Sequence, residues 1–217
     1  MGEIILIFGP PGAGKGTISN FLETKYHYCH FSCGDSLRNI DKNHPSYLTI
    51  SQKLKNGELL NDNIINTFFD QQLKSILSDN KKIVIEGYPR TIGQAQFFDH
   101  WLKDNNLKLS YVFNLVISQE LIYQRIVNRL ICPKCGAVYN LKFLKPKIEN
   151  VCDKCSYSPL LKRNDDNFET IKTRISQYHQ KTSPIIEYFI NKKYNLVKIV
   201  EDHFDNLSDY FSKIENL

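Results

Sequence analysis

Hydrophobic residues fall in short runs that alternate with amphipathic stretches along the chain. Four runs rich in Ile, Val, Leu and Phe have the length of strands, namely residues 3–8, 82–85, 111–117 and 196–200. Helical spacing of apolar residues fills the intervals, over residues 14–26, 64–77, 94–102, 121–130 and 168–189. Buried strands that alternate with helices are typical of a parallel sheet covered on both faces. The pattern therefore predicts an α/β fold.

Two stretches break this alternation. Residues 32–60 are polar and have a helical pattern without a strand, and residues 131–166 are rich in Cys, Pro, Lys and Tyr. We interpret both as insertions into one core domain, which would consist of residues 1–31, 61–130 and 167–217. Within that core, Pro184 is expected to end or kink the last long helix, because proline cannot donate the helical hydrogen bond.

Composition narrows the class of protein. The chain has 217 residues, of which 41% are hydrophobic and 24% charged, as in an ordinary globular protein. The apolar run over residues 4–8 is too short for a signal peptide or a membrane span. Lysines account for the net charge of +5 and are scattered rather than gathered in a tail. We therefore expect a soluble, cytoplasmic monomer that binds neither membranes nor nucleic acid.

Arginine is rare in this lysine-rich chain. The chain has only six arginines among its 28 basic residues, at positions 38, 90, 125, 129, 163 and 174. A guanidinium group can hold two phosphate or carboxylate oxygens at once, whereas a lysine ammonium group is a point charge. The few arginines are therefore candidates for phosphate recognition.

A glycine-rich loop follows the first predicted strand. It reads Gly-Pro-Pro-Gly-Ala-Gly-Lys-Gly-Thr over residues 9–17, between a strand and a helix. Such a loop can turn successive N–H groups toward phosphate, at the positive end of the helix dipole. Lys15 is expected to reach the β and γ phosphates of a nucleotide. The alternative is a plain glycine-rich turn, which the strand–loop–helix context disfavours.

Two C-x2-C pairs lie in the second insertion. The first pair is Cys132 and Cys135, and the second is Cys152 and Cys155. Four thiolates can complete the tetrahedral coordination of zinc and leave no open position, so the sequence predicts a structural zinc site. The alternatives are another metal, free buried thiols or a pair of disulfides, and the expected intracellular setting argues against the disulfides. Cys29 and Cys33 lie outside this pattern.

A third motif stands at the end of a predicted strand. It runs from Glu86 through Gly87, Tyr88 and Pro89 to Arg90. Ligands of open α/β sheets bind at the carboxyl ends of the strands. The motif is a candidate for ligand binding, and an ordinary strand-ending turn is the alternative.

With these motifs in order, the whole chain resembles the adenylate kinases of the long-lid, zinc-containing type. The resemblance rests on GPPGAGKGT, HFSCGDSLR, NGELLND, EGYPRT, RIVNR, the cysteine insertion with GAVY, RNDD and Arg174. It implies a P-loop NTPase-type sheet, an AMP-binding insertion over residues 32–60 and a zinc-bearing lid over residues 131–166. It also implies reversible conversion of ATP and AMP into two ADP with Mg²⁺.

The resemblance assigns roles to individual positions. It makes five residues catalytic: Lys15, Arg90, Arg129, Arg163 and Arg174. It assigns ATP binding to Gly12, Ala13, Gly14, Lys15, Gly16, Thr17, Arg125, Arg129, Val138, Tyr139 and Phe204. It assigns AMP binding to Ser32, Arg38, Glu58, Leu59, Leu60, Gly87, Tyr88, Arg90, Gln94, Arg163 and Arg174. Glu86, where the family commonly has Asp, would hold water on magnesium, and lid closure would involve Asp165 and Asp166.

Two other functions compete with this interpretation. A GTP:AMP phosphotransferase would share the same core chemistry and differ in the donor base. A zinc-ribbon nucleic-acid binder would use the basic and aromatic residues of the lid. That second alternative leaves the glycine-rich loop and the EGYPRT motif unexplained.

Overall fold

A parallel sheet forms the centre of the molecule. The computed structural model describes residues 2–77, 82–200 and 207–212. The strands follow the order β2-β3-β1-β4-β7, and all their pairings are parallel. Their bounds are β1 Gly2–Phe8, β2 Cys29–Ser32, β3 Lys82–Glu86, β4 Leu107–Val116 and β7 Leu196–Val200.

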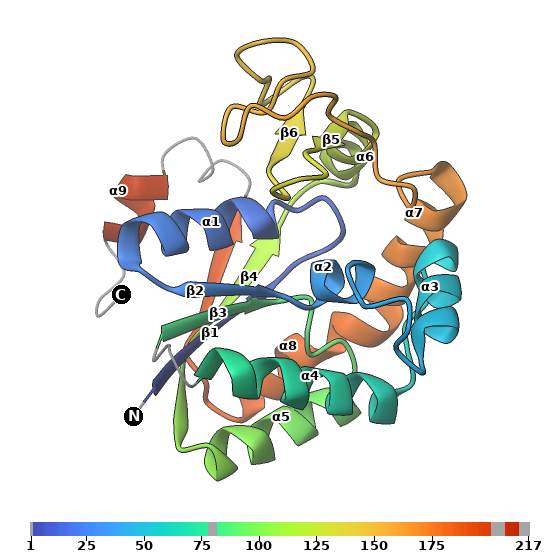
Figure 1. Cartoon of the computed structure of the whole chain (residues 1–217). Coiled ribbons are helices and arrows are strands. Elements are labelled where there is room, and N and C mark those ends of the chain that lie inside the picture. Colours follow the sequence, from blue (N-terminus) through green and yellow to red (C-terminus); the bar gives the residue numbers. More distant parts are fainter. Residues whose placement is uncertain (1, 78–81, 201–206, 213–217) are drawn as a thin grey trace.

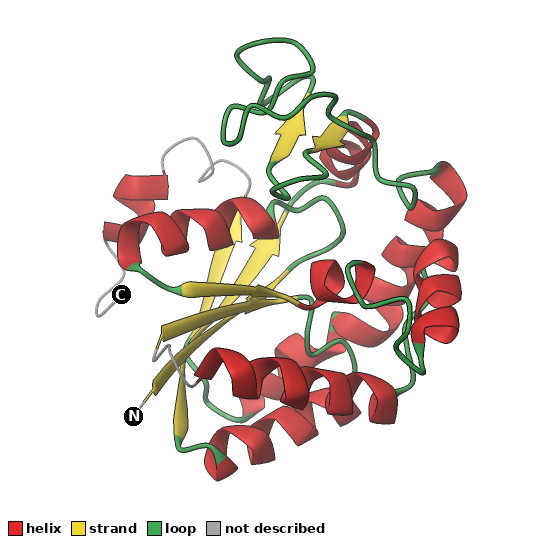
Figure 2. Cartoon of the chain, viewed as in Figure 1, coloured by secondary structure: helices red, strands yellow, loops and turns green. Residues whose placement is uncertain are grey.

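Helices cover both faces of this sheet (Figures 1 and 2). One face carries α4 (Asp62–Leu77), α5 (Ile92–Asp104) and α8 (Pro184–Asn191), which pack on alternate strand residues such as Ile4 and Leu6. The other face carries α1 (Lys15–Tyr26) and α9 (Leu207–Ser212), which pack on Ile5 and Ile7. Because the part of β1 from Ile4 to Phe8 is buried on both sides, its side chains are apolar without alternation.

An aromatic cluster fixes the turn that follows β3. The Tyr88 ring stacks on Phe69 of α4 with 4.0 Å between ring centroids, and Phe69 also contacts Phe98 and Trp101 of α5. The Tyr88 hydroxyl group donates to Asn66 Oδ1 at 2.7 Å. The turn that carries Arg90 is therefore held by the packed core rather than by loop residues alone.

The two predicted insertions extend from the carboxyl edge of the sheet. The first contains α2 (Cys33–Arg38) and α3 (Tyr47–Asn56), and α3 contacts α7 (Phe168–Gln177). The second follows α6 (Gln119–Val127) and β5 (Arg129–Ile131), whose last residue is the first of the predicted segment, and it contains β6 (Val138–Asn140), which pairs antiparallel with β5. Figure 1 shows this second insertion standing above α6, with α7 at its return to the core.

The α/β class and the four predicted strands are confirmed, and three local predictions need correction. The strand β2 was not predicted, since its sequence Cys-His-Phe-Ser has no apolar run. The helix predicted over residues 121–130 ends at Val127, and Arg129–Ile131 pair with β6 instead. The helix predicted over residues 168–189 is divided by a π-helical turn, Tyr178–Thr182, and α8 begins at Pro184.

Within the described part of the chain, no helix combines the length and the hydrophobicity needed to cross a membrane.

Candidate active site and metal centre

The glycine-rich loop connects β1 to the first turn of α1. Gly12 has a φ of 78°, and a Cβ atom there would lie 2.8 Å from Ile126 Cγ1 of α6. Glycine at this position therefore lets the loop curl tightly against α6. Lys15 Nζ donates to the carbonyl oxygens of Gly9 and Pro10, both at 2.9 Å. The loop thus surrounds its own lysine at the N-terminus of a twelve-residue helix, an arrangement suited to anions.

Lys15 faces a buried carboxylate at the end of β3. Glu86 is 8% exposed, and its Oε2 atom has no hydrogen-bond partner among the described residues. Its Oε1 atom lies 3.5 Å from His30 Nε2. Burial raises the pKa of Glu86, but His30 and Lys15 outweigh this effect and hold the pKa below its usual value. Burial lowers the pKa of Lys15 to about 7, although the charge of Glu86 acts in the opposite direction.

A cavity opens between the first insertion and the turn after β3. Its lining combines apolar side chains, namely four leucines and Ile65, with three arginines. The residues that line it are Cys33, Gly34, Leu37, Arg38, Leu54, Gly57, Glu58, Leu59, Leu60, Ile65, Gly87, Arg90, Gln94, Asp165 and Arg174. A cavity lined by both apolar side chains and guanidinium groups suits a ligand that has a neutral, apolar part and an anionic part.

The Gln94 side chain is fixed in one orientation at the wall of this cavity. Its Nε2 atom donates to Asp62 Oδ1, and its Oε1 atom accepts from the Arg90 backbone N–H, both at 2.7 Å. Each end of the amide keeps one further hydrogen-bonding position. The amide cannot flip without losing both bonds, so it presents a fixed donor and acceptor pattern to a ligand.

Four arginines meet three aspartates where the second insertion returns to the core. Asp165 Oδ2 accepts from Arg38 Nη2 at 2.7 Å and from Arg174 Nη1 at 3.1 Å. The Arg129 guanidinium group donates to both carboxylate oxygens of Asp166. These bonds join positions that are far apart in the sequence, since Arg38 and Asp165 are 127 residues apart.

Asp35 joins this network from α2. Its Oδ1 atom accepts from Arg163 Nη2 at 3.0 Å and from Arg38 Nη1 at 3.0 Å. A single carboxylate of the first insertion therefore contacts an arginine of the second. Asp35 was not predicted, although its position three residues before Arg38 on a helix would favour an ion pair between them.

The arginine cluster shifts the titration of its members. Burial lowers the pKa of Arg174 to about 9, although Asp165 acts in the opposite direction. Burial raises the pKa of Asp165, but Arg38 and Arg174 outweigh this effect and bring the pKa to about 2. The cluster thus carries several positive charges in a desolvated place, which only neighbouring anions make tolerable.

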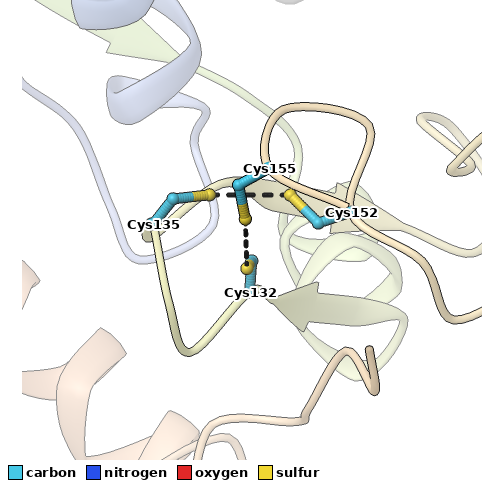
Figure 3. A group of neighbouring side chains, drawn as sticks. All are labelled: Cys132, Cys135, Cys152 and Cys155. Carbon is cyan, nitrogen blue, oxygen red and sulfur yellow. Dashed lines mark hydrogen bonds between the residues drawn. The ribbon is translucent and has the colours of Figure 1, made fainter. Parts of the chain in front are cut away.

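The four cysteines of the second insertion converge on one point (Figure 3). Their sulfur atoms all lie within 4.8 Å of one another, with Cys132–Cys155 and Cys135–Cys152 each at 3.5 Å. Four thiolates at about 2.3 Å from zinc would be about 3.8 Å apart at the corners of a tetrahedron. The donor set and its spacing therefore fit zinc.

Three predicted site residues take places that differ from expectation. Ser32 does not line the cavity but caps α2, where its Oγ atom accepts from the Asp35 backbone N–H, and its neighbour Cys33 lines the cavity instead. Tyr88 points into the aromatic core. The Tyr139 side chain is buried in the second insertion, where its hydroxyl group bonds to Cys152, whereas Val138 is exposed.

The remaining predicted residues divide into those near the cavity and those near the loop. Glu58, Leu59, Leu60, Gly87 and Gln94 line the cavity together with Arg38, Arg90 and Arg174. Arg125 lies beside the glycine-rich loop, with its Nη1 atom 3.2 Å from the Ala13 carbonyl oxygen. Phe204 lies outside the described residues.

The low pKa of Asp165 predicts how the free energy of unfolding depends on pH. In the unfolded chain this carboxyl has a pKa of 3.8, against about 2 in the folded protein. At neutral pH both states are ionised, so the stabilisation is fully present there and is lost as the pH falls below about 4. Asp165→Asn is expected to lower the free energy of unfolding by about 2 kcal/mol at pH 7 and by about 1 kcal/mol at pH 3.

Urea unfolding across this pH range measures the difference between Asp165→Asn and the wild type. Asp104→Asn, which changes an exposed carboxylate at the end of α5, is the matched control and should have little effect. A destabilisation by Asp165→Asn that does not change between pH 7 and pH 3 would contradict the assignment.

The amino-acid sequence is similar to proteins of one known family. Residues 7–194 match the family model described as Adenylate kinase. A protein named adenylate kinase from Petrotoga mobilis is 36% identical over 214 residues, which cover 98% of this chain and 96% of the relative. Adenylate kinases from Thermotoga petrophila and Mycoplasma capricolum are 38% and 36% identical, over 87% and 94% of this chain and 86% and 92% of theirs. The chain therefore belongs to the adenylate kinase family.

Proposed function

We propose that the protein transfers the terminal phosphoryl group of ATP to AMP, reversibly, and so forms two ADP. One observation supports this above all others: the arginines of both insertions and of α7 converge between the glycine-rich loop and the cavity. Phosphoryl transfer requires little covalent help from the protein and depends on alignment and positive charge around the phosphoryl group. A coupled assay of ADP formation from ATP and AMP tests the activity directly.

The cavity is proposed to hold AMP. Its leucines would sandwich the base, and Gln94 would read the base edge by accepting from the amino group and donating to the neighbouring ring nitrogen. Arg38 and Arg90, which line the cavity, would bind the phosphate as bidentate donors.

The glycine-rich loop is proposed to hold the phosphates of ATP. The segment from Gly12 to Thr17 would supply backbone N–H groups, and Lys15 would exchange its two carbonyl partners for phosphate oxygens. Arg125 and Val138 are proposed to lie beside the adenosine end, since Arg125 already borders the loop.

Arg129, Arg163 and Arg174 are proposed to surround the phosphoryl group during transfer. Each now pairs with a carboxylate oxygen, from Asp35, Asp165 or Asp166. Phosphate oxygens are the same kind of acceptor, so the nucleotides can take over these guanidinium groups without new positive charge entering the site. The aspartates keep the arginines buried and oriented before the substrates bind.

The site is also suited to magnesium. The buried Glu86 carboxylate interacts electrostatically with Lys15, and its Oε2 atom has no hydrogen-bond partner among the described residues, so it could accept from the water of a hydrated cation. Bound between the ATP phosphates, Mg²⁺ would neutralise charge and orient the transferred group. Glu86 is one methylene longer than the Asp common in the family, and its role here is to hold a water molecule rather than the ion itself.

The insertions are proposed to act as an AMP-binding domain, residues 32–60, and a lid, residues 131–166, on a core of residues 1–31, 61–130 and 167–217. The Asp35–Arg163 pair joins the two insertions directly over the site. Their closure would exclude water, which otherwise accepts the phosphoryl group in place of AMP.

ATP is the proposed donor, and GTP is not favoured. The three relatives described above, which align over 87–98% of the chain, are each named adenylate kinase. The four cysteines of the lid are proposed to hold one structural zinc ion, which would order the lid and take no part in the chemistry, since its four ligands leave no open position.

The fixed amide of Gln94 predicts strong selectivity for AMP. AMP is expected to be a much better acceptor than CMP, UMP or GMP, because a buried group that meets the wrong base edge stays unpaired. Gln94→Leu is expected to reduce the preference for AMP by about 10- to 100-fold, mainly through KM. Steady-state kinetics with each monophosphate measures this.

Gln96→Leu is the matched control, because Gln96 lies on the exposed side of the same helix. It should leave the preference unchanged. Comparable turnover of the wild type with UMP or CMP would contradict the proposed acceptor site.

Phosphoryl transfer is expected to require the guanidinium group of Arg129. Arg129→Lys keeps the charge but loses the paired donors that now bind Asp166. We expect kcat at saturating substrates to fall by about a thousandfold or more, as for arginines that stabilise phosphoryl transfer elsewhere. Thermal unfolding of the variant checks that the fold is intact. A loss of kcat below about tenfold would show that Arg129 does not stabilise the phosphoryl group during transfer.

Metal removal is expected to act on the lid and to spare the core. The lid cluster contains only a few buried apolar residues, whereas the core has its own sheet and helices. Stripping the metal should therefore lower the melting temperature and loosen the lid without unfolding the core.

Elemental analysis should find one zinc per chain. Cys132→Ser should weaken zinc retention, whereas Cys29→Ser, outside the cluster, should not. Zinc well below one equivalent, with all four thiols free to react, would refute the structural zinc site.

A further inference from the structure

The buried Tyr139 links the two halves of the cysteine cluster. It lies on β6, opposite Leu130 of β5, just after the first cysteine pair in the sequence. Its ring is 6% exposed and packs with Leu130, Leu160, Cys132 and Cys152. The side chain therefore extends from the strand next to the first pair to the second pair.

The Tyr139 hydroxyl group is engaged as both donor and acceptor. It donates to Cys152 Sγ at 3.5 Å, and it accepts from the Asp153 backbone N–H at 2.7 Å. The backbone bond fixes the oxygen atom, so the O–H hydrogen is directed to the sulfur. Asp153 in turn accepts the Lys147 backbone N–H at 2.9 Å, which extends the same connection to the loop between the two pairs.

The two cysteine turns otherwise have the same backbone pattern. The N–H groups of Cys132 and Cys152 donate to the carbonyl oxygens of Ala137 and Tyr157, five residues on. The residues four positions after each first cysteine, Gly136 and Ser156, both have left-handed backbones. The second turn differs from the first in its contacts with the Tyr139 phenol and in the bond between the Asp153 side chain and the Lys147 backbone N–H.

We propose that Tyr139 is a positioning residue of the lid metal site, whose hydroxyl group donates to the Cys152 thiolate and slows the loss of metal. This inference rests on the proposed zinc site. A donor on a thiolate disperses part of its charge, and it also holds the sulfur in the direction of the metal. Because Tyr139 belongs to β6, the same bond fixes the second turn against the β5–β6 hairpin that carries the first.

The test compares Tyr139→Phe with the wild type, and Tyr157→Phe serves as the matched control. Tyr157 lies in the same lid with its ring 39% exposed, and its backbone rather than its hydroxyl group contacts Cys152. The first measurement is the rate of zinc transfer from the loaded protein to a chromophoric chelator. Tyr139→Phe should release zinc about tenfold faster or more, since partners of metal ligands typically contribute 10- to 100-fold in affinity. Tyr157→Phe should match the wild type.

The second measurement is the thiolate-to-metal charge-transfer band of the protein loaded with Co²⁺. A thiolate that loses a hydrogen-bond donor is more easily oxidised, so the band of Tyr139→Phe should move to lower energy. Site-specific Tyr139→3-fluorotyrosine, which has a more acidic hydroxyl group, should move it to higher energy. This second variant keeps the test decisive if Tyr139→Phe does not load with metal.

Unchanged release and an unchanged band would overturn the proposal. Faster release with unchanged bands in both variants would also overturn it, because the ring would then act through packing alone. The wild-type metal content is measured first: if the wild type binds no metal, the zinc site itself is refuted, independently of any result on phosphoryl transfer.

Discussion

The repulsion among buried arginines is the constraint on which the site depends. Arg38, Arg129, Arg163 and Arg174 come from four separate parts of the chain, and each has a side chain less than a quarter exposed. Charges of one sign cannot be desolvated together without counter-charges. Asp35, Asp165 and Asp166 supply these, and their positions therefore require α2, the return of the lid and α7 to meet at one place.

This arrangement explains why the two insertions leave the sheet where they do. The first begins at the end of β2, and the EGYPR turn begins at the end of the neighbouring β3, so Asp35 and Arg90 reach the same region from adjacent strands. The glycine-rich loop leaves β1, next in the sheet. Three neighbouring parallel strands thus bring the glycine-rich loop, the EGYPR turn and Asp35 of the arginine cluster to one edge, as expected for an open α/β sheet.

The buried strands, the cysteine cluster and the candidate phosphate-binding arginines could be predicted from the sequence. The apolar runs identified the buried strands, because strands covered on both faces cannot carry polar residues. The cysteine spacing identified the cluster, because its geometry is local to two short turns. Arg38, Arg90 and Arg174, which line the cavity, were candidates for phosphate recognition because arginine is rare in this chain, and the family resemblance assigned all three to AMP binding.

Other features required the tertiary structure. The strand β2 has only Phe31 as a deeply buried apolar side chain, so periodicity gave no sign of it. Whether Ser32 or Cys33 faces the cavity depends on the path of the backbone from β2 into α2. The sequence motif alone does not determine this path. Tyr139 was expected beside the nucleotide, but the pairing of β5 with β6 turns its ring into the lid, where Cys152 is its partner.

The proposed ATP and AMP sites meet at one arginine cluster. Calorimetric titration with a single molecule in which five phosphates join two adenosines tests it most directly. We expect one molecule to bind per chain, with an affinity far above that of ATP or AMP alone, because a joined ligand binds its second half without a further loss of translational and rotational freedom. Two molecules per chain, or an affinity no better than that of ATP, would contradict it.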